Sequence, residues 1–177
     1  MVKKAVFLDR DGVILKPIIY KKKSYAIRSL SDFKFLPGVI KSIRKLKKKG
    51  FLVFVVSNQP DIGHGIITKS FLNKVNKKIK LKTNIDAFAT CPHRQNEKCS
   101  CRKPKPGMIL SLAKRYKVYL KKSYMVGDRA SDINAGKKAK CKTIFIDNKH
   151  EEKKPHIQEA TFKSLLFAVD HIISKSN

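Results

Sequence analysis

Val6-Phe7-Leu8-Asp9-Arg10-Asp11-Gly12-Val13, near the start of a chain of 177 residues, is the stretch that decides the expected fold. Its first part, the apolar run Ala5–Leu8, is typical of a short strand buried on both faces, and two aspartates follow it directly. Asp9 and Asp11 stand two apart on an extended segment, so their side chains point the same way. One carboxylate can then act as a nucleophile while the other serves as acid and base.

Alternating strands and helices are expected along the rest of the chain. Short apolar runs predict strands at 5–8, 51–56, 85–90, 124–126 and 143–146, and apolar residues at helical spacing predict helices at 37–49, 68–81, 106–116, 131–139 and 162–173. This alternation predicts an α/β, three-layer Rossmann-like fold with a central parallel sheet and helices on both faces. The length suits a single domain over residues 1–177.

Polar clusters stand at the expected strand ends. Besides Asp9 and Asp11, Ser57-Asn58-Gln59 and Gly127-Asp128 each follow a strand, and Arg102-Lys103 lies just before a helix. Ligands of parallel sheets bind at the carboxyl ends of the strands, so we expect these clusters to share one crevice. Two solvated aspartates would explain a lone Asp-x-Asp, but they would not explain the other clusters.

The charge balance is strongly basic, with 41 Lys and Arg against 13 Asp and Glu and a formal net charge of +28. Such a field can hold a nucleic acid, steer a small anionic substrate, or reflect compositional drift. Most of these cations are lysines spread along the chain, so we expect drift rather than a nucleic-acid partner. Because acids are scarce, their clustering after apolar runs indicates a bound cation.

Neither a membrane span nor an export signal is expected. The longest apolar runs, such as residues 51–56, are far shorter than the roughly 20 residues that cross a bilayer. The N-terminus also lacks the apolar stretch and cleavage site of a secretory signal. We therefore expect a cytoplasmic protein and a monomer.

Three cysteines and a histidine fall within residues 91–101. Cys91, His93, Cys99 and Cys101 form the donor set of a closed tetrahedral Zn²⁺ site, which indicates a structural zinc that pins this loop. A cytoplasmic location argues against disulfides. Cys141 stands alone before a strand and is expected to pack in or near the core.

These motifs resemble, in order, those of the haloacid-dehalogenase superfamily of aspartate-nucleophile phosphatases. Residues 6–13 resemble its first motif, and residues 127–132 resemble its acidic fourth motif. Ser57 stands where the second motif has Ser or Thr, and Lys103 stands where the third motif has Lys. The resemblance extends from Ala5 to about Ile146.

The resemblance implies a mechanism. Asp9 would form an aspartyl-phosphate, and Asp11 would protonate the leaving oxygen and later activate water. Mg²⁺ would be held by Asp9, the main-chain carbonyl of Asp11 and Asp128, while Ser57 and Lys103 would bind the phosphoryl group from the other side. Asp132 would orient Lys103 or a magnesium-bound water.

The zinc loop and residues 102–108 resemble the branch that contains heptose-1,7-bisphosphate 7-phosphatases and histidinol-phosphate phosphatases. That branch is capless or has a minimal cap. Carried over to this chain, its substrate contacts fall on residues 17–20, on Arg10, on Asn58 and Gln59, and on Arg102 at the far end of the substrate. The pair Pro60-Asp61 departs from the branch's usual small residues.

Two substrates are consistent with this branch. The short loop between His93 and Cys99 and residues 127–132 favour histidinol phosphate, whereas residues 8–14, 58–65 and 105–108 favour a phosphorylated sugar. The basic surroundings also suit a second anionic group. We expect a magnesium-dependent phosphomonoesterase that removes the 7-phosphate of D-glycero-D-manno-heptose 1,7-bisphosphate, with the anomer open. The alternatives are a histidinol-phosphate phosphatase and, from another class, a zinc-stabilised nucleic-acid-binding protein or a nucleic-acid-end phosphatase.

Overall fold

A six-stranded sheet forms the centre of the computed structural model, which describes residues 2–21, 23–148 and 154–176. Every neighbouring pair of strands in it is parallel. In spatial order the strands are β5 (Ala87–Cys91), β4 (Leu52–Asn58), β1 (Ala5–Leu8), β6 (Tyr124–Gly127), β7 (Lys142–Ile146) and β8 (Ala160–Phe162). The expected α/β fold with a central parallel sheet is confirmed.

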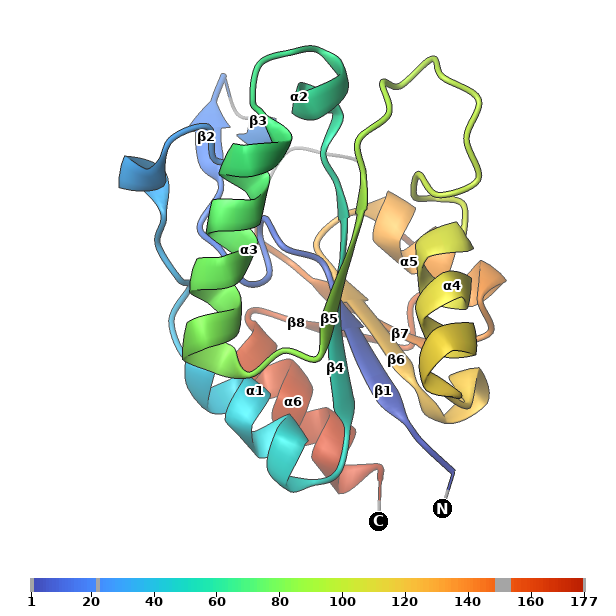
Figure 1. Cartoon of the computed structure of the whole chain (residues 1–177). Helices are drawn as coiled ribbons and strands as arrows, with labels where there is room; N and C mark the ends of the chain where they lie inside the picture. The colour runs from blue at the N-terminus through green and yellow to red at the C-terminus, as the bar shows by residue number, and fades with distance from the viewer. Residues whose placement is uncertain (1, 22, 149–153, 177) are drawn as a thin grey trace.

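Helices cover both faces of this sheet (Figure 1). One face carries α1 (Val39–Lys48), α3 (Lys69–Thr83) and α6 (Leu165–Ser174), and the other carries α4 (Gly107–Tyr116) and α5 (Ala130–Lys138). Strand β1 shows why two cores form: Val6 and Leu8 pack into the first, and Ala5 and Phe7 into the second. All four side chains are fully buried, as the apolar run predicts.

Small elements gather at the carboxyl end of the sheet, at the top of Figure 1. The antiparallel hairpin of β2 (Ile18–Tyr20) and β3 (Lys23–Tyr25) follows β1, and the short helix α2 (Pro60–Gly63) follows β4. Short 3₁₀ turns at Leu30–Asp32 and Leu120–Lys122 complete the described elements. The hairpin is the main structure between β1 and α1, in agreement with a minimal cap.

Some expected boundaries are wrong. The last helix starts at Leu165, not at residue 162, because Ala160–Phe162 pairs with β7 as a sixth strand. Three residues are too few to show a strand period. Ser57 and Asn58 also belong to β4 and do not follow it, since they pair with Thr90 and Cys91 of β5.

The strand order places a crevice above β1. This strand lies between β4 and β6, and the chain leaves it toward β4 on one side and returns at β6 on the other. The crossover helices α1 and α5 consequently diverge to opposite faces, which opens the sheet at its carboxyl edge. Asp9, directly after β1, lies at this opening.

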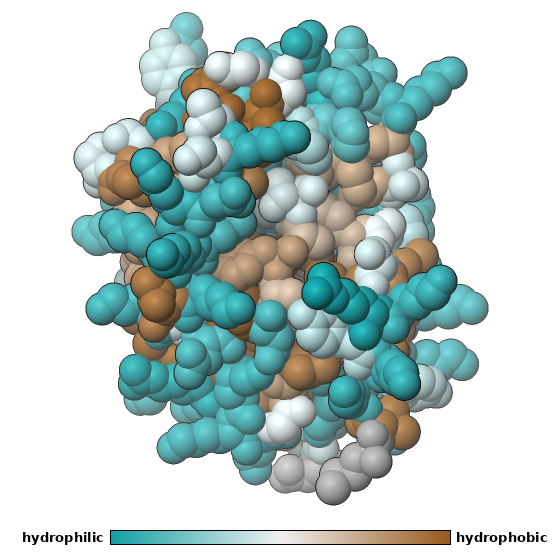
Figure 2. All heavy atoms as spheres, viewed as in Figure 1, coloured by the Kyte–Doolittle hydropathy of each residue, from teal (hydrophilic) through white to brown (hydrophobic). Residues whose placement is uncertain are grey.

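Hydrophilic side chains cover most of the face in Figure 2, with hydrophobic ones showing between them. Among the described residues, no helix has both the length and the apolar character needed to cross a bilayer. The largest exposed hydrophobic side chains are scattered over different elements, such as Leu81 on α3 and Phe167 on α6.

Replacing Phe54 tests the core on the α4 face. Its ring is fully buried, 5.4 Å from the ring of Phe7 and 4.8 Å from that of Tyr116. We expect Phe54→Ala to lower the free energy of unfolding by about 3–5 kcal/mol, because it leaves a cavity between these rings. The matched control Phe167→Ala removes a ring that is 57% exposed and should cost less than about 1 kcal/mol. Equal losses in urea unfolding would contradict this packing.

Candidate active site

Lys103 lies at the centre of the candidate site. Its Nζ lies 2.6 Å from Asp9 Oδ1 and 2.6 Å from Asp132 Oδ1, and it donates a hydrogen bond to the carbonyl oxygen of Val56 at 2.7 Å. Burial acts to lower the pKa of this amine, but the charges of Asp132 and Asp9 outweigh it, so the pKa lies above its ordinary value. Lys103 is therefore a fixed cation beside Asp9, and the expected contact with Asp132 is present.

Asp128 completes a buried acidic cluster with Asp9 and Asp132. Each of the three offers a carboxylate oxygen within 4.8 Å of the others. Burial, followed by the charges of Asp9 and Asp132, raises the pKa of Asp128 well above its ordinary value. Its Oδ1 is buried and has no hydrogen-bond partner among the described residues. One ammonium faces three carboxylates here, and oxygen ligands of this kind fit a divalent cation such as Mg²⁺.

Gly12 and Asn148 position Asp128. A Cβ atom at Gly12 would lie 1.9 Å from Asp128 Oδ2, and the backbone there has a φ of 97°, which favours glycine. Asn148 Nδ2 donates to the carbonyl oxygen of Gly12 at 2.7 Å and to Asp128 Oδ2 at 3.3 Å. Asn148 was not among the residues expected at the site, although it stands just after β7 and polar residues after other strands were expected there.

Asp11 lies in a second hydrogen-bond network. Its Oδ2 accepts from Arg10 Nε at 2.9 Å and from Gln59 Nε2 at 2.8 Å, and the same Gln59 nitrogen lies 2.8 Å from Ser57 Oγ. These contacts bring together four residues that the sequence singled out. Arg10 is fully buried and is not among the residues that line the cavity, so its expected contact with substrate stays a prediction.

The side chain of Asn58 makes two hydrogen bonds with the backbone of Lys103. The Lys103 N–H donates to Asn58 Oδ1 at 3.0 Å, and Asn58 Nδ2 donates to the Lys103 carbonyl oxygen at 3.1 Å. These two bonds join the end of β4 to the segment that carries the buried amine. A positioning contact thus accounts for Asn58, and its expected role toward substrate also stays a prediction.

A cavity of about 290 Å³ opens above these groups. Asp9, Asp11 and Lys103 lie in it together with Ser57 and Gln59, and three arginines line its wall: Arg28, Arg102 and Arg129. Residues 17–20, where substrate contacts were expected, are not part of the lining. The chain turns back there as the hairpin β2–β3, so residues 24–26 and Arg28 face the cavity in their place.

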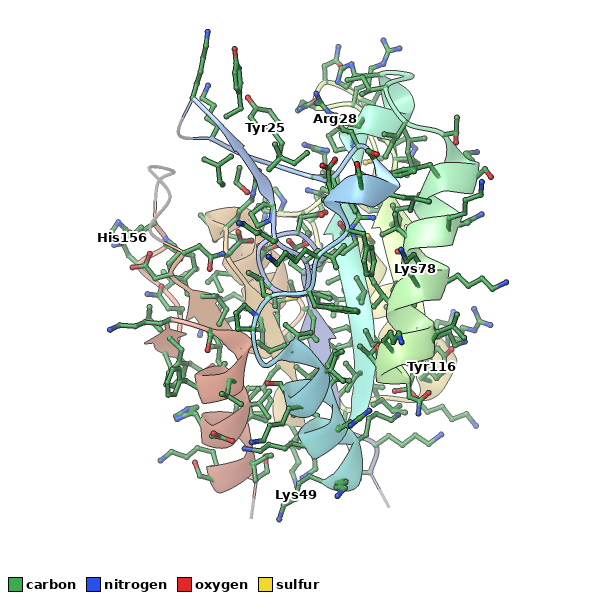
Figure 3. All side chains as sticks on the ribbon, turned by 90° about the vertical axis from the view of Figure 1, so that its left-hand side faces the viewer. Tyr25, Arg28, Lys49, Lys78, Tyr116 and His156 are labelled. Atoms are coloured by element: carbon green, nitrogen blue, oxygen red, sulfur yellow. The ribbon has the colours of Figure 1, made fainter. Side chains whose placement is uncertain are left out.

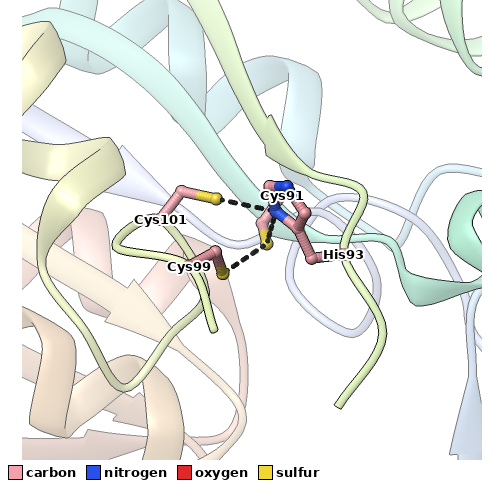
Figure 4. Close-up of side chains that lie close together, drawn as sticks. All are labelled: Cys91, His93, Cys99 and Cys101. Carbon is pink, nitrogen blue, oxygen red and sulfur yellow. Dashed lines mark hydrogen bonds between the residues drawn. The ribbon is translucent and has the colours of Figure 1, made fainter. Parts of the chain in front are cut away.

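The four expected zinc ligands lie together at the end of β5 (Figure 4). His93 Nδ1 lies 3.4 Å from Cys91 Sγ and 3.2 Å from Cys101 Sγ, and the Sγ atoms of Cys91 and Cys99 are 3.8 Å apart. Burial raises the pKa of Cys91 to about 12, and a bound cation would keep this thiol deprotonated. Three sulfurs and one imidazole suit zinc. Cys141 is buried elsewhere in the core, as expected.

Comparison with known proteins assigns the chain to a family. The family model described as polynucleotide kinase 3 phosphatase matches residues 4–163. The chain belongs to this family. The chain is also similar to a solved structure, D,D-heptose 1,7-bisphosphate phosphatase from B. bronchiseptica complexed with magnesium and phosphate. The two are 26% identical, with coverage of 97% of this chain and 99% of that one and a TM-score of 0.85.

Curated relatives are similar over nearly their whole length. A D-glycero-beta-D-manno-heptose-1,7-bisphosphate 7-phosphatase from Helicobacter pylori is 34% identical over 92% of this chain and 95% of its own. A D-glycero-alpha-D-manno-heptose-1,7-bisphosphate 7-phosphatase from Campylobacter jejuni is 37% identical over 93% of each chain. The resemblance to haloacid-dehalogenase phosphatases is confirmed, and the protein is a phosphatase.

Removing the buried cation tests the electrostatics of the site. We expect Lys103→Met to lower the free energy of unfolding in magnesium-free buffer by about 3–5 kcal/mol, because it leaves buried carboxylates without their counter-ion. Burial raises the pKa of Asp132 to about 6 even though Lys103 is present. The carboxylates therefore take up protons as the pH falls, and the loss should shrink between about pH 8 and about pH 5. A loss that is constant with pH in urea unfolding would contradict this account.

Proposed function

We propose that the protein removes the 7-phosphate of D-glycero-D-manno-heptose 1,7-bisphosphate by magnesium-dependent hydrolysis through an aspartyl-phosphate. The observation that carries the chemistry is the buried Asp9 carboxylate in the cavity, which pairs with the Lys103 ammonium and has an oxygen within 4.8 Å of the carboxylates of Asp128 and Asp132. The substrate is proposed from the relatives, which carry this name at 34% and 37% identity.

Asp9 supplies the nucleophile. One of its oxygens attacks phosphorus, so that an O–P bond to Asp9 forms while the bond from phosphorus to the sugar oxygen breaks. Lys103 pairs with Oδ1 of this carboxylate and orients it. Its ammonium and the Ser57 hydroxyl are placed to stabilise the negative oxygens of the transferring group.

Asp11 handles the protons. It lines the cavity, and its Oδ1 has no hydrogen-bond partner among the described residues, while Arg10 and Gln59 hold Oδ2. It would donate a proton to the leaving sugar oxygen and then take one from the water that attacks the aspartyl-phosphate. This second attack releases phosphate and restores Asp9.

Magnesium fits the acidic cluster, with Asp9, Asp128 and the main-chain carbonyl of Asp11 as its protein ligands. When bound, it offsets the repulsion between a carboxylate and a phosphate dianion. The unpaired Oδ1 of Asp128 and the excess of carboxylates over ammonium support this assignment.

The cavity wall favours a substrate with two phosphates. Arg28, Arg102 and Arg129 line it, which suits a second anionic group and disfavours the cationic amine of histidinol phosphate. The family description names a polynucleotide 3 phosphatase, so a phosphorylated nucleic-acid end is the second candidate.

Phosphate release from three substrates tests this function. We expect kcat/KM for the heptose bisphosphate to exceed that for histidinol phosphate and for a 3′-phosphorylated oligonucleotide by about tenfold or more, because the cavity pairs a reacting phosphate with a remote anion. Asp9→Asn should lower kcat by about 10³-fold or more, since it removes the nucleophile.

Asp170→Asn is the matched control, because this aspartate pairs with Lys45 on α1 and is 53% exposed. Its rates should stay within about twofold of the wild type. Full turnover by Asp9→Asn would refute the nucleophile, whereas faster release from the oligonucleotide would refute the substrate.

We also propose that zinc at Cys91, His93, Cys99 and Cys101 has a structural role. The loop that it would close contacts α2: Gly63 N–H donates to the Pro92 carbonyl at 3.0 Å, and Arg94 Nε donates to the Gly63 carbonyl at 2.7 Å. Since α2 lines the cavity, the zinc would fix one wall of it.

Elemental analysis of purified protein tests the zinc site. We expect one zinc per chain in the wild type and its loss in Cys99→Ala, because a three-ligand site binds the metal more weakly. Cys141→Ala is the control, since Cys141 lies apart from the cluster and should keep the zinc. Zinc retained by Cys99→Ala, or absent from the wild type, would contradict the assignment.

A further inference from the structure

The three arginines that line the cavity differ in how their guanidinium groups are held. Arg102 Nη1 donates to the His93 carbonyl at 3.3 Å, and Arg129 Nη2 donates to the Ser24 carbonyl at 2.6 Å. Arg28 is held through Nε alone, which donates to Asp61 Oδ2 at 2.8 Å. Within the described parts of the chain, neither Nη atom of Arg28 has a hydrogen-bond partner.

Two restraints fix the guanidinium of Arg28. Asp61, at the start of α2, binds its Nε edge, and the ring of Tyr25 lies beneath it at 5.7 Å from the ring centre. Figure 3 shows Tyr25 and Arg28 together at the end of the molecule that carries the hairpin and α2. The Arg28 side chain is 44% exposed, yet contacts with Asp61 and Tyr25 fix the orientation of its guanidinium plane. The edge of the guanidinium that carries both Nη atoms makes no hydrogen bond within the described residues.

An arginine edge with two free donors matches a phosphate. Two parallel N–H groups bind two oxygens of one phosphate at once, which a hydroxyl group cannot match. In the proposed function, the reacting phosphate would bind beside Asp9 and Lys103, which line the same cavity and contact each other, whereas Arg28 contacts Asp61 and Tyr25. A second phosphate on the same substrate therefore has a separate, cationic place to bind.

We propose that Arg28 binds the phosphate at the end of the substrate remote from Asp9 and so sets the preference for a bisphosphate over a monophosphate. This inference rests on the proposed function and adds a specificity residue to it. Asp61 and Tyr25 are positioning residues, because they orient the arginine and leave its two terminal nitrogens for the phosphate.

The simpler alternative is a purely structural role, in which the ion pair of Arg28 and Asp61 only holds the segment after β3 against α2. Partly exposed pairs of this kind contribute little to stability. If the ion pair were only structural, loss of Arg28 or of Asp61 would lower activity equally, and it would do so for every substrate that enters the cavity. If Arg28 binds a phosphate, its loss lowers activity more than the loss of Asp61 does, and it does so only for a substrate with a remote phosphate.

Steady-state kinetics of Arg28→Gln on two sugars distinguishes a phosphate-binding role of Arg28 from a purely structural one. The sugars are the heptose 1,7-bisphosphate and the same heptose with the 7-phosphate alone. We expect the ratio of their kcat/KM values to fall by about 10- to 100-fold, mainly through a higher KM for the bisphosphate, because one charged two-point contact is lost. Asp61→Ala, which keeps the arginine, should lower the ratio by less than about threefold.

Arg115→Gln is the matched control. This arginine also lies over a tyrosine, at 5.6 Å from the ring of Tyr116, but it is exposed on α4 and does not line the cavity. The ratio of kcat/KM for the bisphosphate to kcat/KM for the 7-phosphate should equal that of the wild type. If Arg28→Gln keeps the full ratio, or if Arg28→Gln and Asp61→Ala lose activity equally on both sugars, the inference is overturned while the proposed function stands. If the wild type itself shows no preference for the bisphosphate, the proposed substrate is overturned together with the inference.

Discussion

The ammonium of Lys103 among three buried carboxylates is the interaction on which the site depends. Asp9, Asp128 and Asp132 would repel one another without a cation, and Lys103 supplies one positive charge for the three. A divalent ion would balance the remaining negative charge and would in turn reduce the repulsion of a phosphate dianion. Positive charge therefore both stabilises this group of side chains and favours the binding of a phosphate.

The sheet explains why so many charges meet at one point. Strand β1 lies between β4 and β6, so the residues after these three strands reach the same opening from neighbouring positions. Their side chains need no long loops to meet, and the parallel strands beneath them are buried except at the two ends of β4. The hairpin, α2 and the zinc loop then enclose the opening with short segments. The cavity is correspondingly small, which suits a sugar phosphate better than a folded macromolecule.

The parts of this arrangement that sequence predicts are those with a local signal. The run Ala5–Leu8 before Asp9 and Asp11 gave the first strand and its carboxylates, and the spacing of Cys91 to Cys101 gave a metal-binding cluster. The meeting of Asp9 and Asp128 followed from the rule that ligands bind at strand ends, and Lys103 was expected beside them because it precedes a helix at the same edge of the sheet.

The remaining features depend on contacts between residues far apart in the chain. Asn148 holds Asp128 from 20 residues away, and Arg28 meets Asp61 from 33 residues away. Strand β8 exists because Ala160–Phe162 finds an edge of the sheet, and its three residues show no pattern alone. Because of the hairpin, residues 24–26 and Arg28 line the cavity in place of residues 17–20. The contact between Asn58 and Lys103 has a related consequence. Only one residue separates Cys101 from Lys103, so movement of the cysteine-rich loop would act directly on the buried amine of Lys103. Two hydrogen bonds between the Asn58 side chain on β4 and the backbone of Lys103 hold that backbone in place, and they limit how far movement of the loop can displace the Lys103 amine.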